Sequence, residues 1–405
     1  QWTLADGPAA RVLALQVLAR ADAGSEARRQ AHAVVGDVAL ASADPAGAEQ
    51  AYAQVLALVP ASDTAQQGRY AERLAAAIYR QGEAERAAGR TADAARHFAR
   101  VGRQAPNSSA APAALYDGAL QLIALKDWAG ATAALQALRT AHPQHPLAAS
   151  AAPQLALAQA EGGHPREAAL ELERWSATLA DPAAARAARW QAAELFDRAG
   201  DSPRATVVWQ RVQADPDSPL PQVLHARWRL AEHARAAGRG RDEQALLRAL
   251  HQAEAQGGAA RTDATRTLAA RALLRLADPL LTAYRQVALV EPLKTTLARK
   301  KTRFDAALAA LAEVAATGSA EALSLATTQS AALYQDFGRA VLNSQPPRGL
   351  RKADAPAYQQ LLQEQARPFE DKAAELLRLN AERQPVGPGT DPSRQTAAAI
   401  PEPRR

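Results

Sequence analysis

The sequence predicts an all-α protein in which a solenoid of helical hairpins is followed by a bundle of long helices. Apolar residues make up 48% of the chain and aromatic residues only 4%, and Ala, the best helix former, dominates the apolar fraction. Val, Ile, Thr and Tyr are scattered and do not form the alternating runs typical of strands. Small residues, Gly and Pro recur with a period of about 34 residues, the length of one helix–turn–helix repeat. Together these observations predict helices stacked as repeats.

The first segment, residues 1–28, is rich in Ala and Leu, and we expect a helical lead-in there, either half a repeat or a cap. The chain begins at Gln1 and not at Met. We interpret this as a processed signal peptide, a removed lipoprotein leader or a truncated start. The solenoid itself is then expected to begin at residue 29.

Three consecutive segments carry the clearest repeats. The best copy spans 75–108 and contains Gly82, Gly89, Ala94, Phe98 and Pro106. Copies at 29–62 and 112–145 keep small, bulky and Pro residues at matching places: Gly36, Ala48, Tyr52, Pro60, Ala119, Leu122, Ala131, Leu135 and Pro143. A Gly between the helices ends the first in a left-handed conformation, small residues let the helices cross closely, and Pro stops the second helix. This spacing predicts three hairpins.

Weaker copies continue the pattern at 149–182, 186–219 and 224–257. The last is the weakest, because Glu243 stands where the other copies have Ala. One hairpin cannot bury its apolar face alone, so stacked neighbours must supply the core. We therefore expect about six repeats over residues 29–257.

The last part of the chain lacks the regularly spaced Gly, small residues and Pro of the repeats. We expect a C-terminal helical bundle there, over 262–383. Long helices are predicted at about 290–316, 319–343 and 354–383, with a break at 345–349 where two Pro precede Arg-Gly. The apolar residues of the first long helix recur at heptad-like spacing: Leu293, Leu297, Phe304, Leu308 and Leu311. Residues 384–405 are rich in Pro, Gly, Thr and Arg, and we expect a disordered tail.

The repeat pattern resembles the tetratricopeptide repeat (TPR). The resemblance implies a TPR-type solenoid, a right-handed superhelix whose concave groove is lined by the first helix of each repeat. Applied to this sequence, it gives an aromatic ladder with charged flanks as the partner-binding groove: Tyr79, Glu83, Arg86, Tyr116, Leu120, Ile123, Trp190, Glu194, Trp228, Glu232 and Arg235. The fourth copy contributes small and apolar residues: Pro153, Leu157 and Ala160. A register shift of one residue would instead turn these rings into the core. Trp175 and Trp209 lie on the second helices of their repeats, and we expect them in the core.

Several longer stretches are similar to a group of bacterial envelope TPR proteins. They are the residues 78–83, 94–98, 115–117, 127–128, 332–334, 346–350 and 368–373. That group includes proteins encoded beside TolQ/TolR-type motor components, as in myxobacterial gliding-motility clusters. The resemblance implies an exported protein, periplasmic or associated with the outer membrane, that serves an envelope complex. It carries over no catalytic residue.

The net charge of +6 does not by itself indicate a nucleic-acid partner. Only six of the 48 basic residues are Lys, and the Arg residues are spread along the helices. The one dense run, Arg299-Lys300-Lys301-Thr302-Arg303, is interpreted as the solvated face of a helix. Contact of this run with an anionic partner, such as peripheral attachment to a lipid surface or contact with a nucleic acid, stays open as an alternative.

No pattern in the sequence indicates catalysis or a cofactor. The chain has no Cys, and the pair His142 and His145 lacks a third metal ligand nearby in sequence. Nucleophile-elbow, zinc-protease and phosphate-loop motifs are absent from the sequence. We therefore predict a non-catalytic protein-binding scaffold of the cell envelope, without cofactor or metal. The alternatives are a module associated with glycan or peptidoglycan, and a TPR adaptor for polysaccharide export. An enzyme is the least favoured reading.

Overall fold

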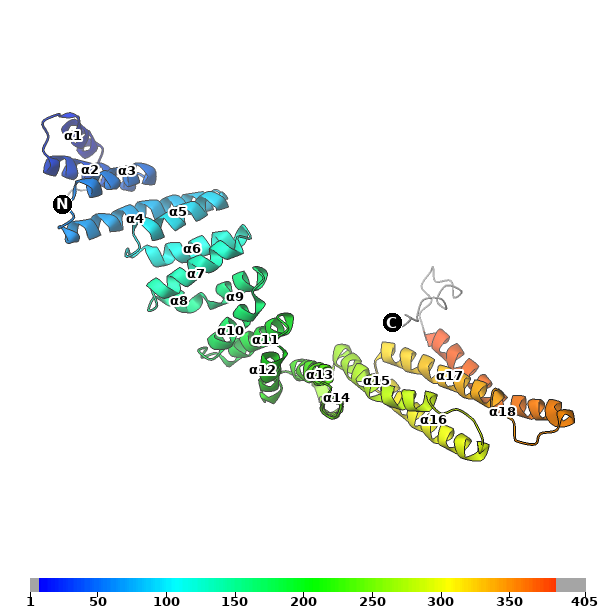
Figure 1. Cartoon of the computed structure of the whole chain (residues 1–405). Coiled ribbons are helices and arrows are strands. Elements are labelled where there is room, and N and C mark those ends of the chain that lie inside the picture. The colour runs from blue at the N-terminus through cyan, green and yellow to red at the C-terminus, as the bar shows by residue number, and fades with distance from the viewer. Residues whose placement is uncertain (1–6, 384–405) are drawn as a thin grey trace. The chain divides into compact units, whose positions relative to one another are not determined.

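The protein is all-α, as the composition predicts. The computed structural model describes residues 7–383, and within that range it contains α-helices and short 3-10 turns but no strand (Figure 1). The chain forms two compact units, Gln1–Val208 and Trp209–Arg405, and the division falls inside helix α12 (Ser202–Ala214). None of the described helices is long and apolar enough to cross a lipid bilayer.

The first unit is a series of helical hairpins. Its helices follow in chain order: α1 (Gly7–Ala19), α2 (Ser25–Ala41), α3 (Pro45–Leu58), α4 (Thr64–Ala87), α5 (Thr91–Gln104), α6 (Ala111–Ala124), α7 (Trp128–Ala141), α8 (Pro146–Ser150), α9 (Ala152–Glu161), α10 (Pro165–Ser176) and α11 (Pro182–Arg198). Each long helix packs against the next one along the chain, so most of the core is built from neighbours in sequence (Figure 1).

The helix ends follow from local chemistry. Asp44, Asp63 and Asp127 each accept a hydrogen bond from a backbone N–H in the first turn of α3, α4 and α7, which caps those helices. Helices α3, α5 and α7 each end two residues before the Pro that the repeat pattern places there. Pro has no backbone N–H and a fixed φ, so a helix usually ends before it. The ends of these three helices could therefore be predicted from the sequence.

The turns inside the hairpins share one left-handed backbone conformation, whether or not Gly occupies it. Gly89, Gly163 and Gly200 have φ of 74°, 87° and 71°. In the two hairpins that lack this Gly, Ala43 and Lys126 take the same place with φ of 56° and 59°. A Cβ is penalised in this region by about 1–2 kcal/mol. The hairpin geometry therefore imposes the conformation, and Gly only makes it less costly.

A small residue on the first helix of a hairpin faces a large residue on the second. A Cβ built on Gly82 would lie 2.6 Å from Phe98 Cε1, and one built on Gly36 would lie 2.6 Å from Tyr52 Cε1. In the next two hairpins the first residue grows to Ala and the second shrinks to Leu, as the buried pairs Ala119–Leu135 and Ala156–Leu172 show. The summed volume of each pair decides how closely the two helices approach.

The second unit contains a further hairpin and then longer helices. They are α13 (Leu220–Ala236), α14 (Gly240–Ala255), α15 (Asp263–Arg285), α16 (Leu293–Ala315), α17 (Ala320–Leu342) and α18 (Ala355–Arg383), with two 3-10 turns, η2 (Gly258–Ala260) and η3 (Lys352–Asp354). From α13 onward each α-helix packs against the next (Figure 1). The long helices share an aromatic cluster in which the ring of Phe304 contacts four other rings, those of Tyr284, Tyr334, Phe337 and Phe369.

The observed division differs from the predicted one. The repeat pattern places α13 and α14 in the solenoid and the start of the bundle at residue 262, whereas the second compact unit begins at Trp209. The ranges 29–257 and 262–383 therefore stay predictions. Residues 1–6 of the predicted lead-in and residues 384–405 of the predicted tail lie outside the described residues.

The interpretation of the basic run as a solvated helix face is wrong for one residue, Lys300. Its side chain is buried, its Nζ donates to the carbonyl of Val287 at 2.9 Å, and it lies 4.2 Å from the centroid of the Tyr284 ring. The other members of the run are exposed. A helix of 3.6 residues per turn cannot point five consecutive residues to the same side, so one of them had to face the core.

Candidate functional site

The first helices of the hairpins, α2, α4, α6, α9 and α11, carry most of the residues predicted to line a groove. Tyr79 lies on α4, Tyr116 on α6 and Trp190 on α11, and all three are partly buried. Trp228 lies on α13, in the other compact unit.

Tyr79 joins two consecutive hairpins. Its hydroxyl donates to Asp117 Oδ2 on α6, and its ring packs against Phe98 with the centroids 5.2 Å apart. Burial, and after it the bond to Asp117, raises the pKa of Tyr79 above its ordinary value. The hydroxyl therefore stays protonated and keeps donating at physiological pH. Tyr79 is a half-covered link between hairpins and not a freely exposed ring of a ladder.

Charged residues surround this link. Arg86 Nη1 lies 3.4 Å from Asp117 Oδ2, and Arg86 Nη2 lies 3.8 Å from Glu83 Oε1. The Arg86 guanidinium also lies 5.8 Å from the centroid of the Phe98 ring. Glu83 and Arg86 were among the predicted groove residues, but Asp117 was not. The Asp117 carboxylate accepts from the Tyr79 hydroxyl and lies beside Arg86, so it connects these residues. Its role is recognised only from its partly buried position beside Tyr79 in the structure.

Tyr116, Leu120 and Ile123 are partly buried along α6. Tyr116 packs against the apolar cluster that contains Leu135, Leu138 and Leu155. Its ring therefore contributes to the hairpin core as well as to the surface. A core contact of this kind is what a one-residue shift in register would give.

The clearest cavity on these first helices lies between α9 and α11. It has a volume of about 430 Å³ and is lined by residues of both helices and one of α10: Pro153, Ala156, Leu157, Ala160, Glu161, Leu172, Gln191, Glu194, Leu195 and Arg198. The set includes the three groove positions of the fourth repeat, Pro153, Leu157 and Ala160, and Glu194 of the fifth. The structure thus brings together predicted residues of two consecutive hairpins.

This cavity has an apolar floor and a charged rim. Leu157, which lines the cavity, is 46% exposed and is therefore accessible to a ligand. At the rim, Arg198 Nη1 lies 3.4 Å from Glu161 Oε1. An apolar hollow with a few charged groups at its edge suits a hydrophobic side chain of a partner, with polar contacts that fix its orientation.

Trp228 is not an open groove residue. It packs against the apolar cluster of Leu224, Leu247 and Leu250, and the Arg275 guanidinium lies 5.1 Å from its ring centroid. Arg275 Nε lies 2.9 Å from Glu243 Oε1, so the Glu that weakened this repeat in the sequence anchors the Arg that covers the ring. The neighbouring groove residue Glu232 pairs with Arg229, while Arg235 is exposed.

His145, one of the two His considered as metal ligands, takes part in a helix cap. His145 accepts the backbone N–H of Leu147 through Nδ1 at 3.2 Å, which commits that nitrogen to capping α8. Within residues 7–383, no three His, Asp or Glu side chains gather in a group that could hold a metal ion.

Comparison with known proteins identifies the repeat type. Residues 76–108, which cover the second half of α4, all of α5 and the turn after it, match the family model described as "Tetratricopeptide repeat". The chain thus carries a TPR, and its fold is of the all-α TPR type. Among curated proteins no significant match was found.

Several solved structures resemble the chain at low sequence identity. A chain of the structure of Naa15/Naa10 bound to HypK-THB is 15% identical with a TM-score of 0.35, over 88% of this chain and 58% of that one. A TPR protein from Parabacteroides merdae is 11% identical with a TM-score of 0.28, over 72% and 93%. The TPR domain of P58(IPK) is 16% identical with a TM-score of 0.24, over 92% and 99%. All three TM-scores are below 0.5, so these likenesses do not identify a function.

Proposed function

We propose that this chain is a non-catalytic scaffold of the bacterial cell envelope that holds a partner protein on the first helices of its hairpins. The TPR fold supports a protein-binding role. The envelope location, periplasmic or at the outer membrane, is proposed from the resemblance of stretches such as 78–83 and 346–350 to envelope TPR proteins. A complex with a TolQ/TolR-type motor is the assembly that this resemblance suggests.

The observation that carries the proposal is the cavity of about 430 Å³ between α9 and α11. It joins two hairpins, exposes Leu157, and has the ion pair of Glu161 and Arg198 at its rim. Hydrophobic side chains that enter such pockets carry most of the binding energy of a protein interface. A partner helix or extended peptide would place one apolar residue there and extend over the neighbouring first helices.

The test is a pair of matched Leu substitutions. Leu157→Lys places a charge in the cavity, and Leu125→Lys places the same charge on a Leu that is 44% exposed outside it. The partner is first isolated by pull-down from envelope extracts of the source bacterium, and its affinity is then measured by calorimetry with purified protein. We expect Leu157→Lys to weaken binding at least about tenfold and Leu125→Lys less than about twofold, because one desolvated charge costs more than 1.4 kcal/mol. Equal effects would refute the cavity as the binding site.

The alternative function, binding of glycan or peptidoglycan, requires accessible aromatic rings. Aromatic rings that stack on sugars must be open on one face, but Tyr79 packs against Phe98 and Trp228 is covered by Arg275. The structure therefore lends the glycan alternative less support. Sedimentation of the purified chain with peptidoglycan or exopolysaccharide, in the absence of any retained protein, would favour it or the polysaccharide-export adaptor.

The envelope location needs its own test. Release of the native protein by spheroplast formation, or its recovery with outer-membrane vesicles, is the expected result. Recovery with the cytoplasmic fraction would overturn the location and leave the binding role intact, because the two proposals rest on different observations.

A further inference from the structure

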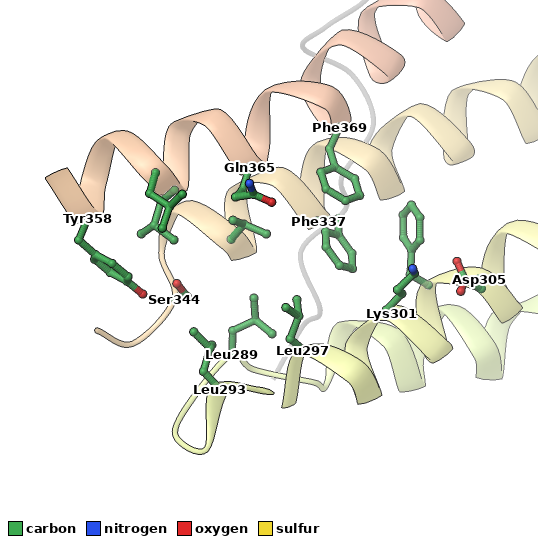
Figure 2. A pocket seen from close by; sticks show the side chains of 14 residues that line it. Leu289, Leu293, Leu297, Lys301, Asp305, Phe337, Ser344, Tyr358, Gln365 and Phe369 are labelled. Atoms are coloured by element: carbon green, nitrogen blue, oxygen red, sulfur yellow. The ribbon is translucent and has the colours of Figure 1, made fainter. Parts of the chain in front are cut away.

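The second unit contains an apolar groove among its long helices. It has a volume of about 390 Å³ and lies between α16, α17, α18 and the connection that precedes α16. Figure 2 shows its lining side chains, which are mostly Leu and aromatic residues. Leu297 and Leu361 line it from opposite sides and are 40% and 48% exposed. This groove lies wholly within the second compact unit and is independent of the proposed site on the solenoid.

The groove follows the helix axes. On α16 its residues recur every fourth position, at Leu293, Leu297, Lys301 and Asp305, and on α18 they recur at similar spacing from Tyr358 to Phe369. The two helices meet at Phe304 and Phe369, whose ring centroids are 6.1 Å apart. From that contact the groove extends to Leu293, a rise of about 16 Å along α16 at 1.5 Å per residue. This length matches about three turns of a helix.

One end of the groove contains hydroxyl groups without a partner. Ser344 is 9% exposed, and neither its Oγ nor the buried Tyr358 Oη has a hydrogen-bond partner among the described residues. Both side chains line the groove, at the end away from Lys301 and Asp305 (Figure 2). A buried hydroxyl without a hydrogen bond is unfavourable, so these groups suit a ligand that presents a donor or acceptor there.

The charge of α16 indicates the sign of the ligand. Between Leu293 and Asp305 this helix carries five basic residues, Lys294, Arg299, Lys300, Lys301 and Arg303, and one carboxylate, that of Asp305. Four of the basic residues are exposed, and none of these four has a carboxylate within 4.0 Å in the part of the chain that the structure describes, whereas most arginines of the solenoid hairpins are paired.

Helical spacing places two of these cations beside the groove. Lys294 follows the groove residue Leu293, Lys301 lines the groove itself, and the two are seven residues apart, which is two turns on the same face. Arg299 and Arg303 project from other faces of the same helix, because residues two positions from the groove row point away from it. An acidic ligand would therefore find its complementary charges along one edge of an apolar groove.

We propose that this groove binds an acidic amphipathic helix of a partner protein. Its apolar residues, spaced i, i+3, i+4 and i+7, enter between Leu297 and Leu361, and its carboxylates lie beside Lys294 and Lys301. A polar group at one end of the helix pairs with Ser344 and Tyr358. The chain then has a second docking site, separate from the hairpin cavity, through which it can join two partners.

The test uses the full chain and a displayed library of amphipathic helical peptides with varied charge. Selection against the native chain, with counter-selection on Leu297→Asp, should enrich acidic helices with the apolar spacing given above. The affinity of the best peptide should fall about tenfold or more in Lys294→Glu/Lys301→Glu. It should change less than about threefold in Arg299→Glu/Arg303→Glu, which alters the net charge of the same helix equally. Circular dichroism and thermal melting establish that both variants are folded.

Four results would overturn the proposal. The first is enrichment of basic or charge-neutral helices, or equal effects of the two double variants. The second is tight binding of the native chain to phosphatidylglycerol vesicles that is lost in Leu297→Asp, which would make the groove a membrane contact. The third is a dimer in sedimentation that Leu297→Asp converts to a monomer, which would make a second copy of this chain the occupant. A chain ending at Arg383 that binds the selected peptide much more tightly would assign the groove to the chain's own C-terminal residues, with the same consequence.

Discussion

The solenoid hairpins and the long-helix bundle bury their cores in different ways. In the hairpins the core is divided into small pairs, such as Gly82 with Phe98 and Ala119 with Leu135, each closed by residues close in sequence. In the bundle one ring, that of Phe304, contacts four others from three helices. The difference indicates that stability is distributed over repeats in the hairpins and centred on the rings around Phe304 in the long-helix bundle. Substitutions can test this, from the largest expected effect to the smallest.

Phe304→Ala should destabilise the second unit most. Removing the ring deletes four aromatic contacts and leaves a cavity, for which a loss of about 3–5 kcal/mol in the free energy of unfolding is expected. Chemical denaturation followed by fluorescence and circular dichroism measures the loss. Leu361→Ala, at a residue that is 48% exposed, is the control and should cost much less. A loss below about 1.5 kcal/mol for Phe304→Ala would contradict a core concentrated on this ring.

Gly82→Ala should destabilise the hairpin of α4 and α5 by about 1–3 kcal/mol, because the new Cβ would lie 2.6 Å from Phe98 Cε1. The double variant Gly82→Ala/Phe98→Leu should recover part of this loss, since the neighbouring hairpins already combine Ala with Leu. Denaturant unfolding of these two variants and of Phe98→Leu completes the double-mutant cycle.

Gly68→Ala is the matched control in the same helix. No atom lies within 4 Å of the Cβ position at Gly68, so Ala should stabilise α4 there by up to about 1 kcal/mol. If both Gly→Ala variants changed stability equally, helix propensity and not the pairing of small and large residues would account for the effect.

Substitutions at the left-handed turn positions should change stability less. A change to Gly should stabilise the protein, and a change from Gly to Ala should destabilise it. Lys126→Gly and Ala43→Gly should stabilise the protein by up to about 1 kcal/mol each, because they relieve a Cβ at φ of 59° and 56°. Gly89→Ala, at φ of 74°, should destabilise it by a similar amount. Thermal melting of the three variants is sufficient to compare them. A loss of stability in Lys126→Gly would mean that the Lys side chain itself supports the turn.

Lys300→Met should produce the smallest change, and a pH dependence of known sign. Burial lowers the pKa of Lys300 below 10.5, with Asp336 acting in the opposite direction. Because the folded pKa is below the unfolded one, the native protein should gain stability as pH rises between the two values. As pH rises through that window, the free energy of unfolding of the native chain should therefore increase relative to that of Lys300→Met. Lys301→Met, at an exposed position of the same helix, is the matched control.

Much of the fold could be predicted from local signals in the sequence. Pro60, Pro106 and Pro143 mark the ends of helices, and Gly89, Gly163 and Gly200 mark turns, because each residue type restricts or frees its own backbone. The hairpins without Gly show the limit of this signal. The conformation of Lys126 is imposed by the two helices it joins, and no property of Lys predicts it.

The candidate sites were less predictable, because they depend on what a neighbouring helix contributes. Repeat spacing predicted that Pro153 and Leu157 face a groove, and both line the cavity between α9 and α11. It did not predict that Tyr79 donates to Asp117 or that the Arg275 guanidinium covers the Trp228 ring. Sequence spacing fixes the face of a helix on which a side chain lies. It does not fix which residue, tens of positions away, packs over that face.

The sequence by itself determined the all-α class, the hairpin repeat and the positions of most helix ends, since these depend on backbone preferences and on contacts between close neighbours. Only the tertiary structure decided that Lys300 is buried, that the predicted aromatic ladder is partly covered, and that α16 and α18 leave an apolar groove between them. These features result from how separate helices approach one another, and that approach is set by the summed packing of many side chains and not by any one segment.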